Sequence, residues 1–132
     1  MTQPSDPAPG PISHPADVYR QAWELLEARA PRRAIEILDP ALDAEPTSAS
    51  LRTLRAWAYF QSAQLTRAEQ DLTRLVQEHP TDVWARFALG RALERQSRFA
   101  DALPHLRLAA AMSGDPDHGL AVLRVEQDLN RS

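Results

Sequence analysis

The sequence repeats with a period of 34 residues, and this period limits the possible folds more than any other feature of the chain. When the chain is shifted by 34 positions, similar residues recur in seven columns. In order along the unit, the columns are Ala22/Ala56/Gly90, Leu25/Tyr59/Leu93, Pro31/Leu65/Phe99, Ala34/Ala68/Ala102, Leu38/Leu72/Leu106, Ala41/Leu75/Ala109 and Pro46/Pro80/Gly114. A period of this length is typical of proteins built from stacked supersecondary units.

The apolar residues indicate that these units are helical. From about residue 16 onward they recur at helical spacing, and no stretch alternates as a strand does. Each unit is therefore expected to hold two antiparallel helices, in which small residues allow a close approach and large ones fill the grooves. The chain has 132 residues, which is the size of one domain. The sequence thus predicts a single all-α domain over residues 16–132.

A unit with small and then large residues in its first helix, Ala and Leu in its second, and a closing Pro resembles the tetratricopeptide repeat. The resemblance covers about residues 15–116 as three repeats, 15–48, 49–82 and 83–116. It implies about seven helices, arranged as antiparallel helical hairpins that stack into a short right-handed solenoid. The last helix, residues 117–131, is expected to cap the third repeat with Leu120, Leu123 and Leu129.

Local signals predict where the helices begin. Thr47, Thr81 and Asp115 stand where N-caps are expected. Pro31 and Pro116 can occupy a first helical position, because the N–H that proline lacks has no helical partner there.

The chain departs from the family pattern at several positions, among them Arg52, Arg55 and Pro40. Arg52 and Arg55 stand where large apolar residues are usual, and we expect Leu51 and Leu54 to replace them through a small rotation of that helix. Pro40 falls inside a predicted helix and is expected to bend it.

The first fifteen residues differ in composition from the rest of the chain. They contain five prolines, Pro4, Pro7, Pro9, Pro11 and Pro15. Proline fixes its own backbone dihedral and biases the residue before it away from helix. We therefore expect residues 1–15 to form an extended, disordered Pro-rich arm.

The resemblance also implies that the first helix of each pair lines a concave groove that binds a peptide. Helical geometry places groove residues beside the small residue of each first helix, three positions before it and one and four after it. The expected groove residues are Tyr19, Trp23, Leu26, Thr53, Trp57, Phe60, Trp84, Phe87, Arg91, Glu94 and Arg95. An exposed aromatic stripe of this kind is typical of an interaction surface. The alternative is that some of these aromatic side chains fill the core left empty by Arg52 and Arg55.

Arg91 and Arg95 lie one turn apart at the end of this stripe. They are either part of a solvated face, with Glu94 and Asp101 as partners, or they receive a carboxylate from a bound peptide. Some family members clamp the C-terminal carboxylate of chaperone tails with Lys, Asn and Arg. This chain has Trp in place of such an Asn and no Lys, which disfavours that activity.

No motif of a catalytic or cofactor site is present. The four histidines are scattered, cysteine is absent, and neither a glycine-rich phosphate loop nor a hydrolase motif occurs. Asp115, Asp117 and His118 could ligate a metal, but a helix start explains them better. We therefore expect no enzyme, no catalytic residue, no cofactor and no metal.

Charge and hydropathy narrow the partners further. The formal net charge of −3 and the mixing of Arg with acids disfavour nucleic acid. No apolar run approaches the roughly 20 residues of a membrane span, and the N-terminus does not resemble a secretory signal, so a cytoplasmic location is expected.

The expected partner is another protein or peptide segment, held by an adaptor or co-chaperone-like scaffold. The alternative is a self-assembling module that forms homo-oligomers through the groove or the terminal helix.

Overall fold

The computed structural model describes residues 15–131, and this part of the chain is entirely helical, as predicted. The seven helices are α1 (Pro15–Glu27), α2 (Pro31–Ala44), α3 (Ala49–Gln61), α4 (Leu65–Glu78), α5 (Val83–Arg95), α6 (Phe99–Ser113) and α7 (Pro116–Arg131). The expected Pro-rich arm lies outside the described residues, except that its last member, Pro15, begins α1. Helix α2 continues through Pro40 to Ala44.

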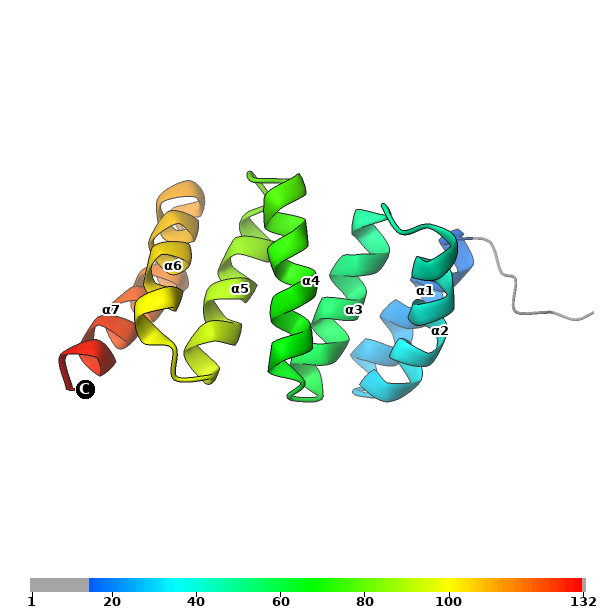
Figure 1. The fold of residues 1–132 in the computed structure, drawn as a ribbon, viewed down its shortest axis with the longest axis horizontal. Coiled ribbons are helices and arrows are strands. Elements are labelled where there is room, and N and C mark those ends of the chain that lie inside the picture. The colour runs from blue at the N-terminus through cyan, green and yellow to red at the C-terminus, as the bar shows by residue number, and fades with distance from the viewer. Residues whose placement is uncertain (1–14, 132) are drawn as a thin grey trace, which may run out of the picture.

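The helices form three antiparallel hairpins and a seventh helix, which follow one another along the long axis of the molecule (Figure 1). Each helix packs mainly against its neighbours in the chain, and α1 also packs against α3. Side chains join the other odd-numbered helices, because Arg95 of α5 covers Phe60 of α3 and Arg124 of α7 binds Glu94 of α5. The odd-numbered helices therefore lie side by side in one layer.

The helix starts follow the predicted chemistry with a shift of one residue. Ser48 and Asp82 cap α3 and α5 by accepting hydrogen bonds from the backbone N–H groups three residues later, so the prediction of Thr47 and Thr81 was wrong. Both sites offer two adjacent capping residues, and the second one completes the turn. Asp115 accepts a hydrogen bond from the Asp117 N–H at 2.9 Å, which places it at the start of α7 as predicted.

The turns inside the three hairpins share one backbone geometry. Arg29, Ala63 and Ser97 have φ values of 59°, 58° and 59°, and they are spaced by the 34-residue period. In each turn the next residue donates its N–H to a carbonyl five residues earlier, as in Ala30 to Leu25 at 2.8 Å. This is the Schellman pattern, in which a left-handed residue ends the helix. Glycine is the usual residue there, so its absence hid these turns from the sequence analysis.

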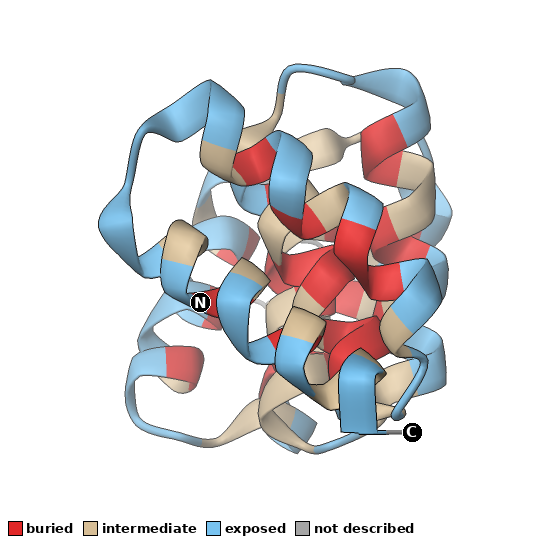
Figure 2. Cartoon of the chain, turned by 90° about the vertical axis from the view of Figure 1, so that its left-hand side faces the viewer, coloured by how far each residue is buried: buried red, intermediate tan, exposed pale blue. Residues whose placement is uncertain are grey.

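The repeat columns form the contacts between paired helices. The small residues at the first and fourth columns are buried, and Gly90 leaves no room for a side chain, since a Cβ there would lie 2.6 Å from Cδ2 of Leu106. Viewed along the stack, buried segments lie on the inward sides of the helices and exposed segments on the outside (Figure 2). The columns therefore mark close helix contacts.

The core consists of two clusters that meet on α3. The first-hairpin cluster joins α1 and α2 to one side of α3 through residues such as Leu26, Leu38 and Leu54. The main cluster joins α3 to all later helices through residues such as Tyr59 and Leu106. Helix α3 is thus shared by both.

Helix α3 also carries a buried ion cluster that the sequence analysis did not anticipate. Leu51 and Leu54 are buried in place of the two arginines, as expected. Arg52 and Arg55 instead both bind Asp71 of α4, with N–O distances of 3.3 and 2.8 Å.

Helix α7 presents a different face to the stack than expected. Leu120 and Leu123 are exposed, so the prediction that they cap the third repeat was wrong, whereas Leu129 does pack against the core. Ala121 and Val125 are the buried residues of α7. Small side chains let α7 lie close to the preceding hairpin.

Candidate functional site

Two adjoining pockets lie on the layer of odd-numbered helices. The first, of about 300 Å³, is lined by Tyr19, Trp23, Thr53, Leu54, Trp57 and Trp84. The second, of about 220 Å³, is lined by Ala56, Trp57, Phe60, Leu72, Trp84, Phe87, Ala88 and Arg91. Because Trp57 and Trp84 line both, the pockets form one continuous surface across α1, α3 and α5, which we call the aromatic groove.

Ring contacts hold the wall of the groove in place. Tyr19 and Trp23 stack with ring centroids 6.2 Å apart, and Trp23 meets Trp57 edge to face at 5.3 Å. Such arrangements are the favoured geometries of aromatic pairs. The groove therefore presents aromatic rings that are already fixed relative to one another.

The aromatic side chains are divided between core and surface. Tyr19, Trp23 and Trp84 are 37%, 40% and 44% exposed. Trp57 packs against the first-hairpin cluster, and Phe60 and Phe87 pack against the main cluster, yet all three also line the groove. The alternative that some of the aromatic side chains fill the core therefore holds in part for these three residues, whose outer surfaces also form the pocket walls.

Two of the expected groove residues face the interior instead. Leu26 is fully buried in the first-hairpin cluster, and Glu94 is buried beneath α7. Both come four positions after the small residue of their helix, which turns them only roughly 40° away from it. That position therefore still faces the core, and Phe60 reaches the groove from it because its side chain is large.

The positions three before and one after the small residue turn further away, by roughly 60° and 100°. The position three before supplies Tyr19, Thr53 and Phe87. The position one after supplies Trp23, Trp57 and Arg91. All six residues line the groove. The sequence analysis missed the floor of the pockets, formed by Leu54, Ala56, Leu72 and Ala88. All four are buried core residues, and three of them directly adjoin groove positions in the sequence, so no separate signal marks them.

Charged groups gather at the α5 end of the groove. Glu94 accepts hydrogen bonds from Arg91 at 2.6 Å and from Arg124 of α7 at 2.9 Å. Burial raises the pKa of the Glu94 carboxyl, but the hydrogen bonds from Arg124 and Arg91 outweigh burial and hold its pKa below the ordinary value. Two guanidinium groups thus share one carboxylate, and the local charge is positive.

Arg95 has a different environment. Its guanidinium carbon lies 4.9 Å from the centroid of the Phe60 ring, at the edge of the groove. Asp101, expected as a partner for these arginines, binds Arg98 instead. Glu94 is therefore the partner of Arg91, as expected, but it is a buried carboxylate and not part of a solvated face.

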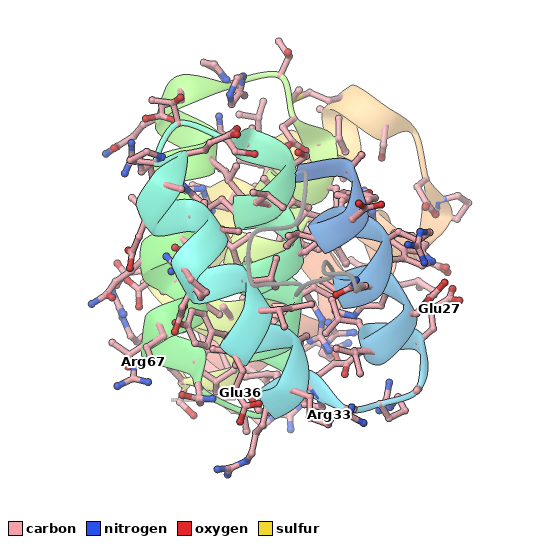
Figure 3. All side chains as sticks on the ribbon, turned by 90° about the vertical axis from the view of Figure 1, so that its right-hand side faces the viewer. Glu27, Arg33, Glu36 and Arg67 are labelled. Atoms are coloured by element: carbon pink, nitrogen blue, oxygen red, sulfur yellow. The ribbon has the colours of Figure 1, made fainter. Side chains whose placement is uncertain are left out.

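A hollow outside the aromatic groove has a mainly polar lining. A hollow of about 360 Å³ between α1 and α2 is lined mainly by polar and charged side chains, including Arg33 and Glu36. Figure 3 shows this end of the molecule, where Glu27, Arg33 and Glu36 point outward. Across residues 15–131, no group of three or more acidic or histidine side chains could hold a metal ion. Over the same range, no helix has the length and apolarity that crossing a membrane requires.

Comparisons with known proteins agree with this architecture. No curated protein matches the sequence. Among solved structures, MamA AMB-1 has a TM-score of 0.78 at 21% identity over 86% of this chain, and the chain spans 63% of that structure's length. The Arabidopsis OM64 TPR domain has a TM-score of 0.79 at 19% identity over 85% of this chain and 93% of that domain. The second TPR domain of human RPAP3, in complex with the HSP70 peptide SGPTIEEVD, has a TM-score of 0.78 at 18% identity over 84% of this chain and 93% of that domain.

The family assignment follows from the sequence itself. A family model described as tetratricopeptide repeat matches residues 19–83 and again residues 53–118. These two matches together span the three hairpins and the start of α7. The chain therefore belongs to the tetratricopeptide repeat family.

Proposed function

We propose that this chain is a protein–protein interaction module, which holds a peptide segment of a partner protein in the aromatic groove as a cytoplasmic adaptor or co-chaperone-like scaffold. The observation that carries the proposal is the open indole surface of the groove. Trp23 and Trp84 are 40% and 44% exposed although they lie in a hollow shared by three helices. Tryptophan is among the residues that most often dominate binding energy.

The comparison with human RPAP3 supports the same use of the fold, since that domain was solved with a bound peptide. The details of its ligand do not carry over. The chain contains no Lys, and Arg91 is bound to Glu94 within the protein, so a clamp for a terminal carboxylate is not part of the proposal. The groove instead favours peptide segments whose side chains are apolar or pack against aromatic rings.

Screening the full chain against a displayed peptide library tests this proposal. Trp84→Ala removes the one large exposed side chain that lines both pockets, and we expect it to weaken selected peptides at least about 10-fold. Leu108→Ala is the matched control, because Leu108 is an exposed apolar residue of α6 that lines neither pocket. Equal affinities for the two variants, with unchanged circular dichroism, would refute binding in the groove.

The exposed leucines of α7 favour a second candidate function, self-assembly. Leu120 and Leu123 lie on the outer face of the last helix, where an unpaired apolar surface can meet a second copy. Sedimentation velocity of the wild type and of Leu120→Glu tests this. A concentration-dependent dimer that the variant abolishes supports it, and a monomer at all concentrations removes it.

A further inference from the structure

We propose that the aromatic groove takes proline-rich segments in an extended conformation, and that its resident occupant is residues 1–14 of the same chain. This inference rests on the proposed function, since it names the class of peptide that the groove receives. Three independent features carry it: the hydrogen-bonding character of the groove wall, the spacing of its two pockets, and the sequence and attachment point of residues 1–14.

The wall of the groove offers hydrogen-bond donors and few acceptors. Trp23, Trp57 and Trp84 make no hydrogen bond to another residue of the described chain, and the indole nitrogen of Trp57 is not buried. An indole N–H can only donate. Within the part of the chain that the structure describes, no Asp or Glu lines the two pockets. An ordinary peptide would bring backbone N–H groups that need acceptors, whereas a proline-rich one brings carbonyls and few N–H groups.

The spacing of the pockets suits a polyproline helix. The first pocket lies between α1 and α3 and the second between α3 and α5, so they are separated by one helix spacing, about 8–10 Å. A polyproline II helix advances about 9 Å in each turn of three residues. Pro4 and Pro7 are three residues apart and so lie on the same face of such a helix. They match two successive aromatic pockets.

The attachment point puts this segment within reach. Helix α1 begins at Pro15, and Tyr19 of the first pocket lies one turn further on, roughly 6 Å along the helix axis. Residues 8–14 span at most roughly 25 Å, which is enough to return over α1 to the first pocket. Gly10 is available for the turn that this path requires. A tether of this length gives an effective concentration on the order of millimolar, so a weak intrinsic affinity suffices.

The charges of the segment and of the groove are complementary. Asp6 is the only acidic residue among residues 1–14, and it lies between Pro4 and Pro7. Among the described residues, Arg91 is the only charged side chain that lines the two pockets, and it shares Glu94 with Arg124. Bound across both pockets, residues 4–7 bring their single carboxylate to a surface on which the charged lining group is a guanidinium.

A spin label on the intact chain tests the proposal. The chain has no cysteine, so Ser5→Cys carries a single nitroxide without further changes. All three tryptophans line the groove, so the three indole N–H cross-peaks of an NMR spectrum report on the groove alone. We expect the label to broaden these cross-peaks to near disappearance. The signals should not depend on protein concentration, because the segment binds in cis.

Paired proline variants provide the matched control. Pro4→Ala with Pro7→Ala removes the two rings assigned to the pockets, and should restore the indole signals. Pro9→Ala with Pro11→Ala removes as many prolines outside them, and should leave the broadening intact. Equal broadening in both variants would mean that tethering alone brings the label near, and would overturn the proposal.

Two further outcomes are decisive. Broadening that appears when labelled chains are mixed with unlabelled isotope-enriched chains, and is absent within one chain, overturns the cis assignment in favour of a second copy. If library peptides bind the groove while the proline variants leave the indole cross-peaks unchanged, this inference fails and the proposed function stands. If the indole cross-peaks respond but no outside peptide binds even to the Pro4→Ala, Pro7→Ala variant, in which the groove is free, the proposed function fails instead.

Discussion

Replacing Asp71 with Ala should destabilise the domain by about 3–5 kcal/mol, the usual consequence of removing one partner of a buried ion pair. The Asp71 side chain is only 5% exposed and accepts hydrogen bonds from Arg52 at 3.3 Å and from Arg55 at 2.8 Å twice. Without it, the buried guanidinium of Arg52 keeps one partner among the described residues, the Pro46 carbonyl. Neither arginine can escape the cost by losing its proton, because arginine remains charged in proteins.

Asp39→Ala is the matched control. Asp39 binds the same Arg55 guanidinium at 3.1 Å, but its side chain is 49% exposed. An ion pair with one exposed partner is screened by water, so this change should reduce the free energy of unfolding by less than about 1 kcal/mol. The difference between the two variants isolates the effect of burial.

Urea denaturation followed by circular dichroism measures both variants. A loss of 3–5 kcal/mol is a large share of the roughly 5–15 kcal/mol that stabilises a typical domain. The double variant Arg52→Met with Asp71→Leu should recover much of the loss, since apolar replacements of a buried pair are often neutral or stabilising. Equal unfolding midpoints for Asp71→Ala and Asp39→Ala would refute the reasoning, because the two carboxylates would then contribute alike.

Three further changes test the packing, the turns and the α5 charges. Gly90→Ala should destabilise by about 1–3 kcal/mol despite the better helix propensity of Ala, because its Cβ would overlap Leu106; an unchanged melting temperature would contradict this contact. Ala63→Gly should stabilise by up to about 1 kcal/mol in urea denaturation, since it removes a Cβ from left-handed backbone; destabilisation would exclude strain there. The lowered pKa of Glu94 means that its stabilisation is present above the ordinary value of 4.5 and is lost as pH falls through the lowered pKa. Glu94→Gln should therefore lose less melting temperature than the wild type as the pH is lowered. Equal losses in the variant and the wild type would contradict this.

The fold was predictable because its contacts are periodic. A small residue at Ala22, Ala56 and Gly90 is required wherever two helices approach closely, so the sequence records each contact in the same register. The hairpin turns repeat with equal regularity in the backbone but not in the sequence. Arg29, Ala63 and Ser97 share a left-handed conformation and no side-chain chemistry, because hairpin closure imposes the geometry.

The candidate site was only partly predictable, for two physical reasons. A helical stripe has no sharp edge, so Leu26 and Glu94 were assigned to the groove although a rotation of roughly 40° keeps them near the core. Residues that form an ion pair between two helices also leave no local pattern in the sequence. Asp71 lies 19 residues from Arg52, and only the folded hairpin brings them together.

The division of the core at α3 has a consequence for how the groove opens. A stack of hairpins unfolds locally from its ends, and α1 and α2 are joined to the rest through one side of α3. The first pocket depends on α1 through Tyr19 and Trp23, whereas the second is built from α3, α4 and α5 alone. Transient release of the first hairpin thus dismantles one pocket and leaves the other intact. A peptide bound across both pockets stabilises the docked state of the first hairpin. It therefore slows amide hydrogen exchange throughout α1 and α2, including at residues that it does not contact.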